Sequence, residues 1–387
     1  MRLNKINNIS ILENCFGCGV CSSACPHDVI KIIENKKGFY TPLIVDKNKC
    51  VNCGICLSVC SFYSNIECNN SNYESYASWS NNSEIRHNAS SGGIAYELAL
   101  SAIKNGYKFC GVKYNINTHR AEHYICSTEE KLKFSLGSKY IPSYTESAFK
   151  QINFKDKYIV FGTPCQIASL RLWLQKKKKE NNFILVDFFC HGVPSLKMWD
   201  KYIIENDIKE NKKIVDIKWR DKKTGWHDSW RIVATDNENQ EIYRSKEVND
   251  DLFYKYFLGH YALSNCCIES CKFKQNNSMA DIRIGDLWGD EYKNEEKGVS
   301  GLICYTENGQ KLISSLNNTL LIIHSNEIVT QGQMKNNAKK PRGYKLVDFL
   351  LKIKPLKLSN ILTIKEYIIL CIDLPKIIIN KLKRILL

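Results

Sequence analysis

Eight cysteines near the N-terminus repeat one spacing twice, and this pattern restricts the fold more than any other feature of the chain. Each copy reads C-x2-C-x2-C-x3-C, in the stretches "CFGCGVCSSACP" and "CVNCGICLSVC". Three cysteines at this spacing wrap one face of a cubane iron–sulfur cluster, and the fourth ligates the neighbouring cluster. The predicted ligands of the first [4Fe–4S] cluster are Cys15, Cys18, Cys21 and Cys60. Those of the second cluster are Cys50, Cys53, Cys56 and Cys25.

The residues between these cysteines favour clusters over structural zinc. Zinc sites use pairs of C-x2-C, whereas this chain has triplets with a trailing fourth cysteine. Gly17, Gly19 and Gly54 let the loop backbone turn inward and offer N–H groups to the sulfurs. Pro26 follows the first copy as the pattern requires, while Ser61 replaces proline after the second. The sequence therefore predicts a bacterial-type two-cluster ferredoxin domain.

This ferredoxin domain is expected to occupy residues 1–66 and to pass single electrons, so the rest of the chain must supply its purpose. The length of 387 residues suits two or three domains. No secretory signal is visible, and 18 cysteines in a cytoplasmic chain indicate metal or redox ligands rather than disulfides. The net charge of +15 fits plain solubility or acidic partners such as an electron carrier. Because no zinc-finger, RNA-recognition or helix-turn-helix pattern is present, no nucleic-acid partner is expected.

The remainder of the chain alternates segments of strand and helix character. "KYIVFGT" and "FILVDFFC" are typical of strands, and "PCQIASLRLWLQ" and "SLKMWDKYIIEN" are typical of helices. Residues 127–136 and 143–152 are also expected to be helical. This alternation predicts a mixed α/β body with α+β elements. Residues 73–153 form its N-terminal part and residues 154–340 its C-terminal part.

Residues 341–387 are predicted to be a basic amphipathic helical tail. Charged residues such as Glu366, Asp373 and Lys376 deny it the roughly 20 apolar residues that a membrane span needs. The tail can lie flat on the inner face of the membrane, making the protein peripheral there. It can equally dock on the body or on another subunit, and both alternatives stay open.

Polar, glycine-containing loops fall between strands and helices of the body. In "SSGG", Ser91 is expected to cap the following helix. In "FGTPCQ", Thr163 is the expected N-cap and Pro164 the first helical residue. "LGSKYIPS" places Lys139 in a turn. A helix N-terminus at the carboxyl end of a strand suits a phosphate or a ring carbonyl, so together these loops indicate a ligand-binding rim at one sheet edge.

Further cysteines occur near the same loops. Cys165 begins a predicted helix, Cys190 ends a predicted strand, and Cys266, Cys267 and Cys271 cluster in "SNCCIESCKFK". A third [4Fe–4S] cluster is arithmetically possible from four of them, with either Cys266 or Cys267 as one ligand. The alternative interpretation is that these are buried, inert thiols.

Six motifs occur in a fixed order after the ferredoxin domain: "SSGGI", "LGSKYIPS", "VFGTPCQIASL", "FCHGVPS", "WRDKKTGW" and "ADIRIGDLWGD". With them the chain resembles the beta-subunit family of coenzyme F420 hydrogenase and dehydrogenase. The resemblance extends to about residue 340 and includes the bacterial members found with polysaccharide-biosynthesis genes.

The resemblance implies an iron–sulfur oxidoreductase with a flavin-binding body that holds FAD. The residues that match the flavin loops of the family are Ser91, Gly92, Gly93, Lys139, Thr163, Pro164 and Cys165. The family's cluster beside the flavin uses cysteines that match Cys165, Cys190 and a C-x2-C pair. Here Cys271 fits the second position of that pair, but Ile268 occupies the first; Cys267 stands one residue early.

The expected activity is therefore transfer of electrons from a ferredoxin- or flavodoxin-type donor, through [4Fe–4S] clusters, to FAD and an unidentified small organic substrate. The family context adds a link to polysaccharide biosynthesis. His191 is a candidate hydrogen-bond donor to flavin or substrate, or a structural histidine. Asp286 and Trp288 either close the substrate pocket or only pack. Two alternatives remain: an electron-transfer subunit without its own substrate, and a cluster-containing binding protein in glycan assembly.

Overall fold

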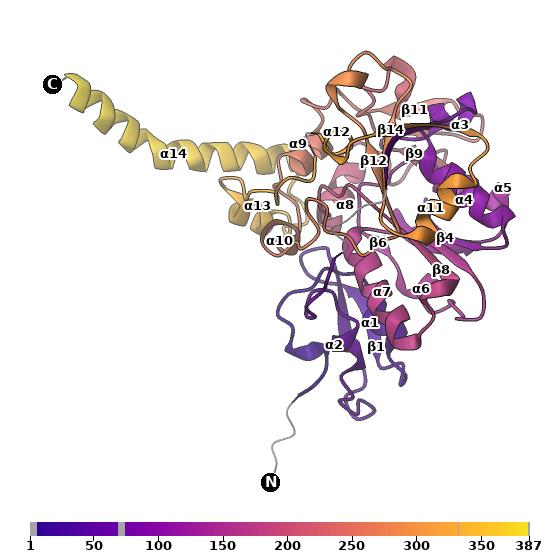
Figure 1. Ribbon diagram of the computed structural model, residues 1–387. Helices are drawn as coiled ribbons and strands as arrows, with labels where there is room; N and C mark the ends of the chain where they lie inside the picture. The colour runs from indigo at the N-terminus through magenta and orange to yellow at the C-terminus, as the bar shows by residue number, and fades with distance from the viewer. Residues whose placement is uncertain (1–5, 69–73, 332, 386–387) are drawn as a thin grey trace, which may run out of the picture.

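The computed structural model describes residues 6–68, 74–331 and 333–385. A small N-terminal module, coloured indigo in Figure 1, packs against a larger α/β body, and a long C-terminal helix projects from the body. The predicted mixed α/β class is confirmed by this arrangement.

The N-terminal module is built from two short helices and one β-hairpin. Helices α1 (Val20–Ala24) and α2 (Ile55–Ser58) each follow a glycine with left-handed backbone, and β1 (Ile30–Glu34) pairs antiparallel with β2 (Tyr40–Ile44). A Cβ atom at Gly19 would lie 2.0 Å from the Thr145 Oγ1 of the body, so this position requires glycine for both φ and space.

A nine-stranded mixed sheet forms the centre of the body. Its strands in spatial order are β14 (Thr319–His324), β3 (Ser75–Ser80), β13 (Ser300–Cys304), β12 (Ile282–Asp286), β8 (Phe183–Phe188), β7 (Tyr158–Phe161), β4 (Lys108–Asn115), β5 (Arg120–Cys126) and β6 (Ser143–Tyr144). Strands β12, β8, β7 and β4 run parallel, and β3 shares their direction because both β3 and β12 are antiparallel to β13. Their carboxyl ends therefore meet at one edge. Strands come from both residues 73–153 and residues 154–340, so these two parts are one structural unit.

The central strands are buried on both faces, as expected for a parallel sheet covered by helices. On β7, Ile159 packs in the core beneath α4 (Ile94–Lys104) and α11 (Glu307–Ser314). The next residue, Val160, packs on the opposite face with α7 (Pro164–Lys177), α6 (Glu146–Phe149) and α1 of the N-terminal module. The module therefore extends the core on the α7 face of the sheet.

The remaining elements cover the edges of the body. The small sheet has the order β11 (Glu241–Arg244), β10 (Val233–Thr235) and β9 (Asp216–Lys218). The other helices are α3 (Ser83–Asn88), α5 (Glu129–Leu132), α8 (Leu196–Glu205), α9 (Leu252–Leu258), α10 (Asn265–Glu269), α12 (Asn326–Val329), α13 (Tyr344–Leu350) and α14 (Leu358–Ile385). Two predicted helices are shorter than expected: only residues 129–132 of the first are α-helical, and the second begins as strand β6.

Helix α14 is attached to the body through its first turns and, farther along, through an ion pair between Arg342 and Asp373. Leu358 and Ile361 are fully buried, and the Lys365 ammonium donates to the Tyr261 hydroxyl at 3.2 Å. Tyr367 is 67% exposed. Figure 1 shows that the far part of α14 projects away from the body. Within the described ranges, no helix combines the length and apolar character needed to cross a membrane.

Candidate iron–sulfur and cofactor site

The first predicted ligand set lies where the N-terminal module meets the body. Burial raises the pKa of the Cys21 thiol well above its usual value, and neighbouring thiols add to the rise. Those neighbours include Cys18, Cys15 and Cys60, so the first set is one group in space. The Gly17 N–H donates to the Cys15 Sγ at 3.2 Å, as expected for a loop glycine that offers its N–H to a sulfur ligand.

The second set lies at the outer side of the module. Burial raises the pKa of Cys56, and the nearby Cys53 and Cys25 thiols raise it further. The Asn8 amide lies 3.6 Å from the Cys50 Sγ. Cys53 is exposed to solvent, whereas Cys56 is buried. The second group therefore presents one edge to the outside.

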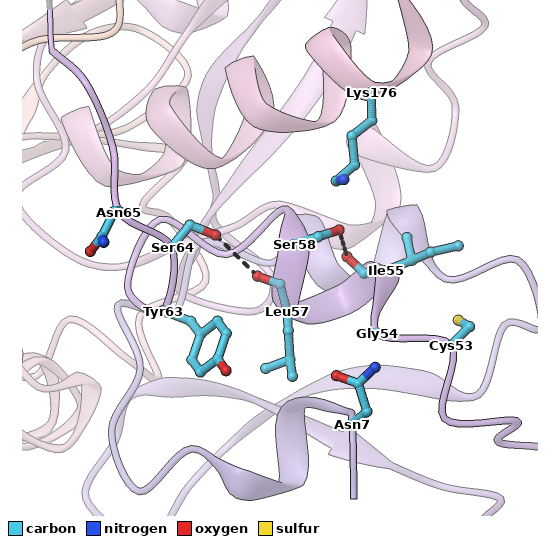
Figure 2. A pocket seen from close by; sticks show the side chains of 10 residues that line it. All are labelled: Asn7, Cys53, Gly54, Ile55, Leu57, Ser58, Tyr63, Ser64, Asn65 and Lys176. Carbon is cyan, nitrogen blue, oxygen red and sulfur yellow. Dashed lines mark hydrogen bonds between the residues drawn. The ribbon is translucent and has the colours of Figure 1, made fainter. Parts of the chain in front are cut away.

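A hollow of about 650 Å³ opens beside Cys53. Figure 2 shows that its wall includes Ile55 and Leu57 of α2, and that Lys176 reaches toward it from α7 of the body. Among its lining residues Lys176 carries the only charged side chain. The exposed edge of the second group is thus bordered by positive charge, which suits an acidic partner.

Four later cysteines form a third group. Burial raises the pKa of Cys165 well above its usual value, and the Cys190 and Cys267 thiols add to this effect. Burial also raises the pKa of Cys190 to about 11, with Lys274 opposing the shift and Cys271 adding to it. Cys165, Cys190, Cys267 and Cys271 thus come together although they are spread over three separate segments of the body.

The sequence alone left Cys266 and Cys267 as alternatives for this group, and the structure separates them. Helix α10 turns Cys267 toward Cys190 and Cys271. The Cys266 thiol instead accepts a hydrogen bond from the Cys15 backbone, at the first group. Cys267 is therefore the member of the third group.

The three groups are in series. Cys56 of the second group lies within electrostatic range of Cys21 of the first. Cys18 of the first group lies in the same range of Cys165 of the third. The order thus runs from the exposed Cys53, through the module, to the strand ends of the body.

The donor set fits cubane clusters. In the part of the chain that the structure describes, no three histidine, cysteine or carboxylate side chains converge on a point where they could hold one metal ion. A cubane takes each thiolate on a different iron atom, so its ligands surround a volume. The sets of four spaced thiols in this protein match the ligands of a cubane, not those of a single metal ion.

The loops predicted to bind a cofactor do meet at one edge of the sheet. The Ser138 N–H donates to the Ser90 Oγ at 2.8 Å, and the Gln166 amide donates to the Ser143 Oγ at 3.1 Å. The "LGSKYIPS" loop therefore touches both of the others. Thr163 and Pro164 begin α7 as expected.

The expected role of Ser91 as helix cap is wrong. Gly93, with φ of +91°, is the N-cap of α4, and the Ser91 Oγ donates to the Val299 carbonyl at 2.6 Å. A Cβ atom at Gly92 would lie 2.4 Å from the Ser78 carbonyl oxygen, so this glycine is required by close packing against β3. The loop is thus fixed by the body itself.

Lys139 is folded back onto its own turn. Its ammonium donates to the carbonyls of Leu136 and Gly137 at 2.8 and 3.0 Å. Burial lowers the pKa of Lys139 to about 8. A ligand contact by this side chain has to replace those hydrogen bonds.

His191 is packed rather than free. Its Nε2 donates to the Phe257 carbonyl at 3.3 Å, and its ring lies 4.9 Å from those of Phe257 and His260. Burial, together with His260 and Lys274, lowers its pKa to about 4. His191 is therefore neutral near pH 7, with Nδ1 left to accept a hydrogen bond.

Asp286 and Trp288 belong to a packed cluster around Arg220. The guanidinium lies 3.3 Å from the Asp286 carboxylate and 4.2 Å from the centre of the Trp230 ring. Trp288 stacks on Trp226 at 4.3 Å. Asp286 and Trp288 were expected either to close a substrate pocket or only to pack, and the contacts seen here are packing contacts.

Three lysines near these sites were not singled out by the sequence. The Lys222 ammonium donates to the Arg86 and Lys297 carbonyls at 2.6 and 2.8 Å, and also to the Ser91 carbonyl, which ties the "SSGG" loop to "WRDKKTGW". Lys272 and Lys274 flank Phe273 beside Cys271. The sequence feature that could have indicated Lys272 and Lys274 is the alternation of lysines after a cysteine in "CKFK".

Comparison with known families agrees with this arrangement. The profile of the C-terminal part of the beta subunit of coenzyme F420 hydrogenase/dehydrogenase matches residues 155–327. This stretch of the body is therefore similar to that beta-subunit family. A second profile, described as "4Fe-4S dicluster domain", matches residues 14–63. The resemblance read from the six motifs and the two-cluster ferredoxin domain are both confirmed, and the chain is an iron–sulfur protein of the electron-transfer type.

The chain is also similar to solved structures. One of them is a chain from a xenon derivative of the F420-reducing [NiFe] hydrogenase complex of Methanosarcina barkeri, with 16% sequence identity and a TM-score of 0.47. The alignment covers 74% of the present chain and 90% of that chain. Comparison with curated proteins gives no match.

Proposed function

We propose that the protein is an FAD-containing iron–sulfur oxidoreductase that takes single electrons from a ferredoxin- or flavodoxin-type carrier and reduces a small organic substrate. The observation that carries this proposal is the series of three thiol groups. It begins at the exposed Cys53 and ends at Cys165, on the first turn of α7. A binding protein has no need for such a route from the surface to a loop rim.

The rim suits a phosphate-bearing cofactor through its backbone. The N-termini of α4 and α7 lie at the same sheet edge and offer N–H groups to an anion. When bound there, FAD holds two electrons and delivers them as a hydride, whereas a cluster carries one. The side chains of Ser91 and Lys139 already have protein partners, so the backbone is the principal contact in this proposal.

The electron balance defines the carrier requirement. Reduction of one substrate molecule consumes two electrons and two protons, and therefore two molecules of a one-electron carrier. The carrier docks at the hollow beside Cys53, where Lys176 supplies the positive charge that an acidic surface needs. The same residues permit the reverse direction, with the organic substrate as donor.

A role in polysaccharide biosynthesis is part of the proposal and follows from the family context alone. The projecting segment of α14 adds an attachment site for a membrane surface or another subunit. Its exposed residues Tyr367, Leu370 and Ile372 give it an apolar surface, and the sequence adds basic residues toward its end. A vesicle-binding assay separates these two attachments. If α14 attaches to a membrane, the full chain binds anionic vesicles and a chain lacking residues 366–387 does not.

The deciding experiment is the cofactor content of the protein purified without oxygen. About twelve iron atoms, twelve sulfides and one FAD per chain are expected for three cubanes and a flavin. About eight iron atoms with FAD would remove the third group from the ligands but keep the enzyme. Eight iron atoms without flavin, even after addition of FAD, would overturn the oxidoreductase proposal in favour of an electron-transfer subunit.

A further inference from the structure

The segment Cys271–Lys274 reaches from the body to the N-terminal module and carries two lysines, one on each side of a buried phenylalanine. We name it the lysine arm. Phe273 packs against Phe16 of the module, with ring centres 6.0 Å apart, and Phe16 packs against Phe62 at 5.2 Å. This apolar contact fixes where the two ammonium groups of Lys272 and Lys274 lie.

Lys272 points to the first thiol group. Its ammonium donates to the carbonyls of Ser61, Phe62 and Ser64 at 3.1, 2.8 and 3.0 Å. These residues closely follow Cys60, a predicted ligand of the first cluster.

Lys274 points to the third thiol group. Its ammonium donates to the carbonyl of Cys190 at 2.6 Å. A second cation lies nearby, because the Arg283 guanidinium is fully buried in the same region. That charge is cancelled by a bidentate pair with the Asp187 carboxylate, with both contacts at 2.7 Å. Lys274 is thus a positive charge beside the third group that has no ion-pair partner among the described residues.

Neither lysine of the arm has a carboxylate partner among the described residues, although ion pairs are frequent elsewhere in the body. Three backbone carbonyls satisfy Lys272 and one satisfies Lys274. Carbonyl dipoles do not cancel a full positive charge. The two ammonium groups therefore act on whatever negative charge is placed on the neighbouring thiol groups.

The direction of that action follows from Coulomb's law. Reduction adds one negative charge to a cluster that is already held by four thiolates, and burial away from water makes this addition harder. Cys18, Cys21 and Cys60 of the first group are buried and the four thiols of the third group are partly buried, while the second group has the exposed Cys53. Without a compensating cation, an electron would be more stable on the outer cluster than on the inner two.

We propose that Lys272 and Lys274 are positioning charges that raise the reduction potentials of the first and third clusters, respectively, so that an electron from the outer cluster can move inward. The proposal rests on the proposed function only for the assignment of the third thiol group to a cluster. It requires neither flavin nor substrate, so its failure is distinguishable from failure of the oxidoreductase proposal.

The test is a redox titration of the full-length protein, followed by electron paramagnetic resonance of the reduced clusters. A Cys190→Ala variant identifies the step that belongs to the third cluster. Lys274→Met is expected to make that cluster at least tenfold harder to reduce at a fixed potential, which is a shift of about 59 mV for a one-electron couple. Lys272→Met is expected to shift a ferredoxin-domain step instead and to leave the third unchanged.

The charge-conserving variants Lys272→Arg and Lys274→Arg are the controls and should keep potentials close to the wild type. If the arginine variants shift as far as the methionine variants, packing and not charge is responsible and the proposal is wrong. Equal shifts of all steps, or a wild-type protein with only two steps, also overturn it. If Lys274→Met does not retain its cluster, Lys274→Gln takes its place, because it keeps a donor for the Cys190 carbonyl without the charge. Its reduction potential is then compared with those of the wild type and Lys274→Arg.

Discussion

At the scale of single residues, His123 is a polar group enclosed by the body. Its Nε2 donates to the Phe161 carbonyl at 3.1 Å, while its Nδ1 has no partner in the described structure. Burial lowers the pKa of His123 to about 4. The neutral ring therefore holds the end of β7, directly before the loop of Thr163 and Cys165.

This pKa predicts a pH dependence of stability. In the unfolded chain the ring takes up a proton near pH 6.5, but the folded protein resists protonation until about pH 4. Stability that is present above pH 6.5 is thus lost as the pH falls toward 4, by about 2 kcal/mol between pH 7 and pH 5. Anaerobic thermal unfolding at both pH values should show a smaller loss for His123→Gln than for the wild type; an equal loss contradicts the assignment.

The adjacent pair Cys266 and Cys267 offers a matched test of the third ligand set. Cys267→Ala should lower the iron content by about four atoms per chain, because it removes one ligand of a cubane. Cys266→Ala should keep the full content, since that thiol lies at Cys15 rather than at Cys190. Iron and sulfide analysis of both variants gives the answer, and a loss in Cys266→Ala alone would reverse the assignment.

At the scale of elements, the contact between the N-terminal module and α7 explains why serine, not the proline of the ferredoxin pattern, occupies position 61. The Ser61 N–H donates to the Ser169 Oγ of α7 at 3.1 Å, and the Ser61 Oγ donates to the Cys165 carbonyl at 3.1 Å. Proline has neither group. The departure from the ferredoxin pattern is therefore part of how the module joins the body.

Restoring the usual ferredoxin residue should consequently weaken the protein. Ser61→Pro loses both hydrogen bonds and also removes the Ser61 Oγ that accepts from the buried Ser169 hydroxyl at 2.8 Å. The expected cost is about 1–3 kcal/mol in the free energy of unfolding. Ser61→Ala keeps the backbone N–H and should lose less. Denaturant unfolding of the two variants measures the difference; a proline variant as stable as the wild type would show that the contact contributes nothing.

Most elements were predictable because their signals are local. The strands around "KYIVFGT" and "FILVDFFC" and the helix that begins at Pro164 follow from apolar runs and a capped turn. The eight-cysteine pattern also specified the first two thiol groups. Strand β6 was mistaken for helix because two residues pairing with β5 give no periodic signal.

The third group was only partly predictable, and for a different reason. Its four cysteines stand on segments that become neighbours only through the order of the sheet and the turn of α10. Spacing in the sequence could not separate Cys266 from Cys267. The same holds for the cap of α4, where Ser91 has a suitable side chain but a long-range hydrogen bond to Val299 decides its orientation.

At the scale of the whole molecule, the positive charge beside Cys53 predicts how the protein selects its carrier. Lys176→Glu should slow reduction by an acidic ferredoxin or flavodoxin at least several-fold, and should flatten the salt dependence of the rate. Reduction by a small uncharged reductant should be unchanged. The control is Lys213→Glu, an exposed lysine between α8 and β9. Stopped-flow kinetics compares the variants; equal slowing by both would mean that net charge, not this hollow, is responsible.

The packing of the N-terminal module against α7 also bears on when the clusters can be inserted during synthesis. Ser169 and Thr145 of the body bind the loop around Cys18, which is only 7% exposed. A scaffold protein that delivers a preformed cluster has to reach these thiols from outside, before the body closes over them. The cysteines of the module leave the ribosome before the body does and are free at that stage. We therefore expect each newly made chain to receive the clusters of the N-terminal module before the body folds around them.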